Sequence, residues 1–194
     1  LRAAKGNIYN TVFSQNSASN GGGVYYYKSK TKLSNLTFFG NDATTEGGGI
    51  YISGDLSSTG ASNLSIKNSI FTGNTKGNVL DVKGSDIHVN ADVIGIENSI
   101  LQIPSNLFGS LIQPFENNLL GIDPLLNDKS NPAGADGFFG TADDGLGISL
   151  CSPAVNAANA DGLNISITDL DVKGQQRIYN NLLDMGAYEA SPIL

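Results

Sequence analysis

The stretch NLTFFGNDATTEGGGIYIS, residues 35–53, decides the fold because its parts recur through the first half of the chain. Each recurrence opens with an asparagine, two further residues and a large apolar residue. Four segments have this form: NTVF (10–13), NLTF (35–38), NSIF (68–71) and NSIL (98–101). Their last residues lie 25, 33 and 30 positions apart. Repeats of this length are typical of solenoid proteins, in which one unit is too small to bury its own apolar face.

A second asparagine, a glycine-containing turn and a short strand follow three of these segments. The asparagines are Asn16, Asn41 and Asn74, and the strands are GGGVYYY (21–27), GGGIYIS (47–53) and GNVLDVK (77–83). Apolar and polar residues alternate in LSIKN (64–68) and IGIEN (94–98), which is the period of a β-strand. We find no convincing amphipathic stretch of helical period, so each unit is expected to hold two or three short strands.

Stacking such units predicts an all-β fold, a parallel β-helix with coils over residues 1–120. Strands of successive coils would pair at a spacing of about 4.8 Å, with inward Ile, Leu, Val and Phe in continuous columns. The asparagines that open the units are expected to take the left-handed turn and to hydrogen-bond one another as a ladder: Asn10, Asn35, Asn68 and Asn98. The alternative is a β-sandwich, whose tight hairpins favour Asn-Gly or Asp-Gly. Outside one acidic loop only Asn20-Gly21 and Asp161-Gly162 have this form, which favours the β-helix.

The pattern changes at about residue 120, where a loop-rich C-terminal module (121–194) begins. Its motifs are NNLLGIDPLL (117–126), an acidic loop, CSPAVNA (151–157), DLDVKG (169–174) and DMGAYE (184–189). Because the last coil of a β-helix exposes unpaired backbone groups, we expect this module to cap that coil. Arg177 is expected to pair with Asp169, Asp171 or Asp184.

Both parts of the chain resemble bacterial surface proteins. F-x-x-N followed by GGG(I/V), over residues 7–101, is similar to the repeat of chlamydial polymorphic outer-membrane proteins and related right-handed β-helix surface proteins. Residues 121–189 resemble, in the order of their motifs, the C-terminal module of choice-of-anchor Q proteins, although the usual SPAINAG is SPAVNAA here and ends in Ala158. The resemblance implies a right-handed helix, bacterial secretion and display on the cell surface, with a sorting or anchoring tail after the module.

The loop NPAGADGFFGTADDGLG, residues 131–147, concentrates three aspartates and five glycines in a chain that is only 15% charged. Ca²⁺ takes about six to eight oxygen ligands from carboxylates, carbonyls and water. We therefore predict a calcium site with these ligands: Asp136, Asp143, Asp144, the backbone carbonyl near Phe138 and, as weaker candidates, Asn131 and Asp128. The segment also resembles calcium repeats of the thrombospondin type. The alternative is a solvated loop whose aspartates cap its turns. In either case Phe138 or Phe139 is expected to pack inward.

Few residues suggest catalysis. His88, the only histidine, would share a strand face with Asp86 as a candidate acid–base pair, and Asp81 and Asp92 are close by in the sequence. A single histidine beside an aspartate is more often ordinary surface, so we do not expect an enzyme. Cys151 has no base near it in the sequence and is expected to be a small buried apolar residue.

Two tyrosines offer a candidate ligand surface. Aligning GGGVYYY with GGGIYIS places Tyr25 over Tyr51, with both rings outward. The pair is either a platform for a sugar ring or a protein partner, or a ladder that only stabilises the coils.

Charge and hydropathy limit the partners. A net charge of −7 without a basic stripe disfavours nucleic acid. No apolar run approaches the roughly 18–20 residues of a transmembrane helix, so we expect no direct membrane insertion. Exposed strand edges would allow head-to-tail self-association into filaments. We therefore predict a non-enzymatic extracellular structural or adhesive protein of a bacterial surface or matrix, stabilised by calcium. The alternative is a carbohydrate-binding or carbohydrate-active protein, such as a polysaccharide lyase or hydrolase.

Overall fold

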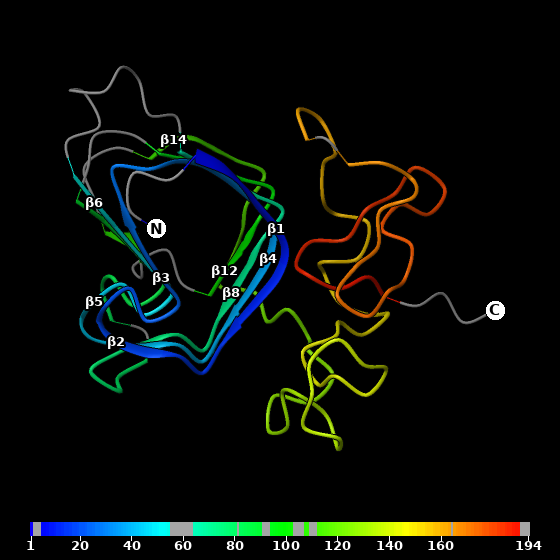
Figure 1. The fold of residues 1–194 in the computed structure, drawn as a ribbon, viewed down its shortest axis with the longest axis horizontal. Coiled ribbons are helices and arrows are strands. Elements are labelled where there is room, and N and C mark those ends of the chain that lie inside the picture. The colour runs from blue at the N-terminus through cyan, green and yellow to red at the C-terminus, as the bar shows by residue number, and fades with distance from the viewer. Residues whose placement is uncertain are drawn as a thin grey trace.

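The computed structural model of the chain is all-β, as the sequence predicts. It describes residues 1, 5–54, 64–80, 82–90, 94–102, 107–108, 112–163 and 165–190, and within these ranges the regular elements are strands, with no helix (Figure 1). The strands are β1 (Lys5–Ser14), β2 (Ser17–Asn20), β3 (Val24–Tyr27), β4 (Lys30–Phe39), β5 (Asp42–Glu46), β6 (Ile50–Ser53), β7 (Leu64–Lys67), β8 (Ile70–Thr72), β9 (Thr75–Lys76), β10 (Ile87–Asn90), β11 (Ile94–Glu97), β12 (Ile100–Leu101), β13 (Leu107–Phe108), β14 (Ile112–Glu116) and β15 (Leu119–Leu120).

The strands form three sheets, and all pairings between these strands are parallel. One sheet has the order β13-β10-β6-β3 and another has the order β2-β5-β9. The third sheet has the order β14-β11-β7-β4-β8-β12-β15, and β1 pairs with β4. This sheet is strongly curled, because the long strand β4 turns at Asn35 and pairs with β7 before that residue and with β8 after it. Figure 1 shows these strands nested behind one another around a common core.

Inward side chains of neighbouring strands lie over one another, as the alternation predicts. The rings of Phe13, Phe38 and Phe71 stack with centroids 4.7 and 4.6 Å apart and interplanar angles of 10° and 5°. These separations match the strand spacing of about 4.8 Å, so the side chain at this position of each strand stacks directly on its counterpart in the next strand. Three further columns, aliphatic except for Tyr26, complete this core: Val24–Ile50–Ile87, Tyr26–Ile52–Val89 and Leu33–Ile66–Ile96.

The asparagines that open the repeats turn the chain, but they do not form the predicted ladder. The left-handed turn is confirmed at all four positions, with φ of 49°, 54°, 51° and 49° at Asn10, Asn35, Asn68 and Asn98. A fifth such residue, Asn117 with φ 54°, marks a repeat that the sequence analysis did not count. The side-chain amides of two of these residues donate to the C-terminal module instead, to the carbonyl oxygens of Leu170 and Asn159, both at 2.8 Å. At these two corners the side-chain amide therefore hydrogen-bonds the C-terminal module and not the next coil.

The second asparagine of each repeat builds the hydrogen-bonded ladder. Asn41 Oδ1 accepts from the backbone N–H and the side-chain amide of Asn16 at 3.1 and 3.0 Å, and Asn74 Oδ1 accepts the same two bonds from Asn41. Asn74 donates in turn to Asp86 Oδ1 at 2.9 Å. Asn41 and Asn74 are buried, so this asparagine ladder ties successive segments together from within the fold.

The glycine triplet is required by close approach of the backbone. Gly47 has φ 71°, in the left-handed region that glycine adopts freely. A Cβ placed on Gly48 would lie 2.1 Å from the carbonyl oxygen of Thr75 and 2.7 Å from that of Ser85. No side chain fits at such distances, so the turn between β5 and β6 needs glycine even at positions with ordinary φ.

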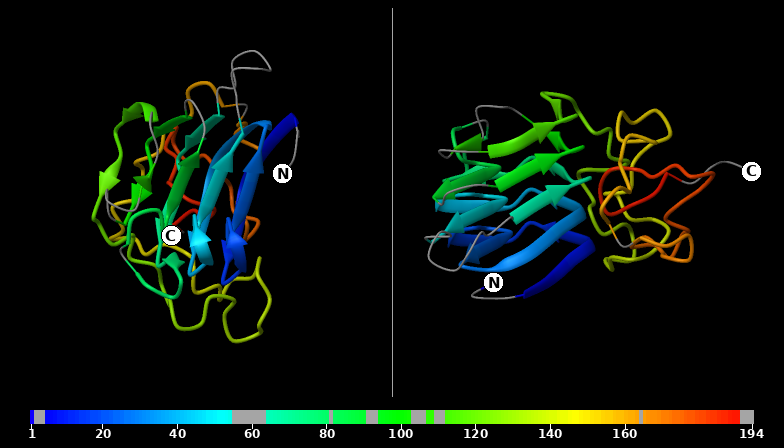
Figure 2. Two further views of the ribbon diagram at one scale, coloured as in Figure 1. Left: turned by 90° about the vertical axis from the view of Figure 1, so that its left-hand side faces the viewer. Right: turned by 90° about the horizontal axis from the view of Figure 1, so that it is seen from above.

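The residues after Leu120 pack along one flank of the strands (Figure 2). The Gly186 N–H donates to the Asn68 carbonyl at 2.8 Å, and the Ala187 N–H donates to Thr37 Oγ1 at 3.0 Å. The outward apolar residues of the curled sheet join a second core with this module: Val12, Ile70, Ile100 and Leu119. The predicted cap on the last coil is therefore not observed, because the module covers a side of the strands.

Candidate functional site

The aspartates of the acidic loop, residues 131–147, order the loop itself. Asp143 Oδ2 accepts from the N–H groups of Ala135 and Asp136 at 2.5 and 3.3 Å, and Asp136 Oδ1 accepts from the Phe138 N–H at 2.8 Å. The Thr141 hydroxyl donates to Asp143 Oδ1 at 2.8 Å. This bond, followed by those from backbone amides, lowers the pKa of Asp143 below its ordinary value. These contacts are the turn capping that the sequence left open as the alternative to calcium.

Asp144 is the buried one of the three aspartates of the loop, and it links the loop to the closing GAYE motif. It is 2% exposed, and its Oδ2 accepts from the Gly140 N–H at 2.8 Å and from the Tyr188 hydroxyl at 2.9 Å. Burial, and after it the bond to Asp144, raise the pKa of Tyr188. Asp144 therefore has a structural task that joins two motifs far apart in the sequence.

The predicted calcium ligands lie in one loop, but their oxygens face donors of the protein. The Phe138 carbonyl accepts from the Thr141 hydroxyl at 3.2 Å, and the Asn131 carbonyl accepts from the Gly134 N–H at 3.1 Å. Among the described residues, which include the whole loop, no three His, Cys, Asp or Glu side chains converge as a metal ion would require. These contacts are those of turn capping, and calcium binding stays a prediction.

Two packing expectations for single residues are wrong. Phe138 and Phe139 are 71% and 46% exposed, so neither is packed inward. Cys151 is exposed rather than buried. The loop is ordered by hydrogen bonds to its carboxylates, and its buried apolar side chain in the second core is Leu146, rather than either phenylalanine.

The two tyrosines stack as the alignment of their repeats predicts. Tyr25 and Tyr51 pair in register, with ring centroids 5.3 Å apart and an interplanar angle of 29°. His88 continues the stack from β10, with its ring 5.2 Å from that of Tyr51 at 21°. Each face of the Tyr51 ring is thus taken by a neighbour, which favours the stabilising ladder over a sugar platform at this residue.

His88 pairs with a glutamate and not with the predicted aspartate. Its Nδ1 lies 2.9 Å from Glu46 Oε2, and Glu46 also pairs with Lys76. Burial lowers the pKa of His88, while the Glu46 carboxylate opposes this shift. Asp86 is fully buried and accepts from the asparagine ladder. The other two acids considered for catalysis, at positions 81 and 92, lie outside the described residues.

A buried charge cluster closes the C-terminal module. Arg177 is 0% exposed; its Nε lies 3.2 Å from Glu189 Oε1, and its Nη2 donates to the carbonyls of Asp184 and Gly186 at 3.0 and 2.7 Å. The ion-pair partner is thus Glu189, which the sequence analysis did not consider. Burial raises the pKa of Glu189 to about 8, although the Arg177 guanidinium opposes this.

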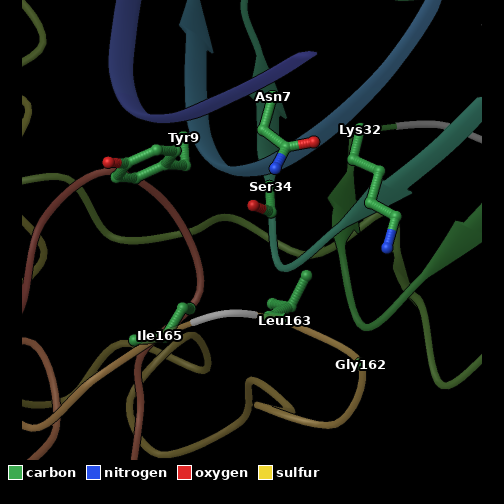
Figure 3. Close-up of a pocket in the computed structure, with 7 residues that line it drawn as sticks. All are labelled: Asn7, Tyr9, Lys32, Ser34, Gly162, Leu163 and Ile165. Atoms are coloured by element: carbon green, nitrogen blue, oxygen red, sulfur yellow. The ribbon is translucent and has the colours of Figure 1, made fainter.

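A hollow of about 240 Å³ lies between the outer face of β1 and β4 and the C-terminal module (Figure 3). Its lining combines an aromatic ring, an amide, an ammonium and a hydroxyl group with two apolar side chains: Asn7, Tyr9, Lys32, Ser34, Gly162, Leu163 and Ile165. None of these was predicted as a site residue. The available signal was the alignment of NIYN (7–10) with KLSN (32–35), which places four outward polar residues on adjacent strands.

Comparisons with protein-family models, with curated proteins and with solved structures found no match to this chain. The described residues contain no helix that is long and apolar enough to cross a membrane. The family resemblance therefore rests on the sequence motifs alone.

Proposed function

We propose that this chain is an extracellular structural or adhesive protein of a bacterial cell surface, built as a right-handed parallel β-helix. Parallel sheets, in-register core columns and left-handed asparagines between strands support the β-helix. The F-x-x-N…GGG and SPAVNA…GAYE motifs support secretion and surface display. We assign no reaction to the chain. The proposed role is mechanical: the chain presents a rigid surface and stacks head to tail with further copies of itself.

One observation carries this role: among the described residues, apolar side chains at both ends of the strand core are only partly buried. Ile8 and Phe13 on β1, and Phe115 on β14, are only partly buried, whereas Leu33 and Phe38 on β4 are 1% and 0% exposed. β1 and β2 are also the edge strands of their sheets. Partly buried apolar side chains beside edge strands favour head-to-tail contact with a second copy of the chain. A heterologous contact of this kind repeats from copy to copy and builds a filament.

Sedimentation velocity over a range of protein concentrations tests the stacking. The wild-type chain is expected to form larger species as its concentration rises. Ile8→Lys places a charge at the end of the core and should leave monomers, whereas Gln176→Lys adds the same charge at an exposed position of the module and should assemble normally. A wild-type chain that stays monomeric throughout, or assembly that survives Ile8→Lys, would contradict the proposal.

Calcium at the acidic loop is a separate part of the proposal, supported by the density of carboxylates between residues 131 and 147. A ligand that binds only the native state stabilises it by about 2.7 kcal/mol at roughly a hundredfold excess over its Kd. Thermal unfolding with calcium and with excess chelator should therefore differ, and Asp143→Asn combined with Asp144→Asn should remove the difference. Equal unfolding temperatures would leave the aspartates with turn capping alone.

A further inference from the structure

The hollow on the outer face of β1 and β4 arises because neighbouring side chains on these two strands differ in size. Tyr9 pairs in register with Ser34, and Asn7 pairs with Lys32, so a large ring on the edge strand stands beside a small hydroxymethyl group on the next. Gly162, Leu163 and Ile165 of the module lie opposite these two pairs (Figure 3). The space is therefore set by both parts of the chain, and it is bounded by a sheet, which is a rigid support.

The four polar side chains of the hollow (Asn7, Tyr9, Lys32 and Ser34) are not used to hold the fold. Within the part of the chain that the structure describes, none of them has a hydrogen-bond or ion-pair partner. A lysine one strand away on the same face differs in this respect, because Lys67 pairs with Glu97 at 3.0 Å. A free ammonium on a chain of net charge −7 is a local attraction for an anion.

We propose that this hollow binds one acidic sugar, a uronate unit of a polysaccharide. Its volume of about 240 Å³ is below the roughly 300–1,000 Å³ of pockets for drug-sized ligands and suits a single ring. The Lys32 ammonium pairs with the sugar carboxylate, and the Asn7 amide and the Ser34 hydroxyl bond the ring hydroxyls. Tyr9 and Leu163 cover the C–H face of the ring.

The donor set favours a carboxylate over a phosphate. A phosphate carries up to two charges and is usually held by several backbone N–H groups or by arginine, and the hollow offers one ammonium beside neutral groups. A neutral sugar would use the ring and the hydroxyl groups and leave Lys32 without a partner. The charge of the ligand is therefore the testable part of its identity.

This inference names a ligand for the adhesive part of the proposed function and rests on it to that extent. Isothermal titration calorimetry with short oligomers of galacturonate, glucuronate, mannuronate and guluronate, and with a neutral galactose oligomer, measures the binding. We expect saturable binding of at least one uronate oligomer that weakens as salt is raised, with the galactose oligomer at least about tenfold weaker.

Substitutions separate the hollow from other surfaces. Lys32→Gln and Tyr9→Ala should each weaken uronate binding by about tenfold or more, while Lys67→Gln, on the same face, and Tyr25→Ala, on another sheet, should bind as the wild type does. All four side chains are outward, so circular dichroism should report an unchanged fold. Absence of binding to any of the four uronates, equal binding of the galactose oligomer, or full binding by Lys32→Gln would overturn the proposal. Stacking in the sedimentation experiment is measured without sugar, so either idea can fail alone.

Discussion

Replacing Asn41 with alanine tests whether the asparagine ladder holds successive segments together. Its side chain takes part in four hydrogen bonds: it accepts from the N–H and the amide of Asn16 at 3.1 and 3.0 Å, and donates to the Phe13 carbonyl at 2.9 Å and to Asn74 Oδ1 at 3.0 Å. A bond of this kind contributes about 0.5–1.5 kcal/mol, and buried partners left unpaired add to the loss. We expect Asn41→Ala to lower the free energy of unfolding by about 3–5 kcal/mol.

Asn35 supplies a matched control within the same repeat. Asn35 and Asn41 are both 0% exposed, yet neither amide atom of Asn35 has a hydrogen-bond partner in the described part of the chain. Its φ of 54° is one that glycine adopts freely. Asn35→Gly should therefore change the free energy of unfolding by less than about 1 kcal/mol.

Urea unfolding followed by far-ultraviolet circular dichroism measures both variants. The midpoint should fall strongly for Asn41→Ala and little for Asn35→Gly, with similar m values because the surface exposed on unfolding is the same. Asn16→Ala, at the exposed end of the ladder, should lie between them, at about 1 kcal/mol. Equal losses for Asn35→Gly and Asn41→Ala would refute the claim that the ladder, rather than the corner asparagine, carries the stability.

Three further predictions concern the turn and the module. The folded-state pKa of Glu189 is raised from 4.5 to about 8, so the folded protein holds this proton more tightly than the unfolded chain does. Protonation of Glu189 therefore adds to the free energy of unfolding, with the full contribution below pH 4.5 and none once the pH has risen through 8. Urea titrations between pH 5 and 8 should show stability falling by up to about 1.4 kcal/mol per pH unit, and Glu189→Gln should flatten this slope. Gly48→Ala should prevent folding in expression trials, whereas Gly162→Ala, with open space around its Cβ position, should cost only about 1 kcal/mol. Tyr188→Phe removes the hydroxyl bonded to the buried Asp144 carboxylate and should lower the thermal midpoint, and an unchanged midpoint would show that this bond contributes nothing net.

The parts of the fold that follow from neighbouring repeats could be predicted from the sequence. Tyr25 meets Tyr51 because the glycine triplets before them set the same register, and the alternation of small polar and apolar residues decides which side chains enter the core. The left-handed asparagines follow from local sterics in the same way.

Contacts between distant segments could not be predicted in this way. Asn68 bonds Asn159, which is 91 residues away, and Asp144 bonds Tyr188, which is 44 residues away. No period or spacing in the sequence links either pair. The hollow has the same origin, because it needs Leu163 of the module to lie opposite β1 and β4.

The two asparagines of a repeat make different contacts, and together these contacts hold the strands and the module against each other. The ladder asparagines face inward and tie strand to strand, whereas Asn10 and Asn68 at the corners bond the module. Between them, β8 is buried on both faces, since Phe71 enters the strand core and Ile70 enters the module core. Neither core can open at β8 without exposing the other side of the same three-residue strand. The covered flank thus contributes stability, and the hollow, the proposed ligand site, lies beside it between the outer face of β1 and β4 and the module.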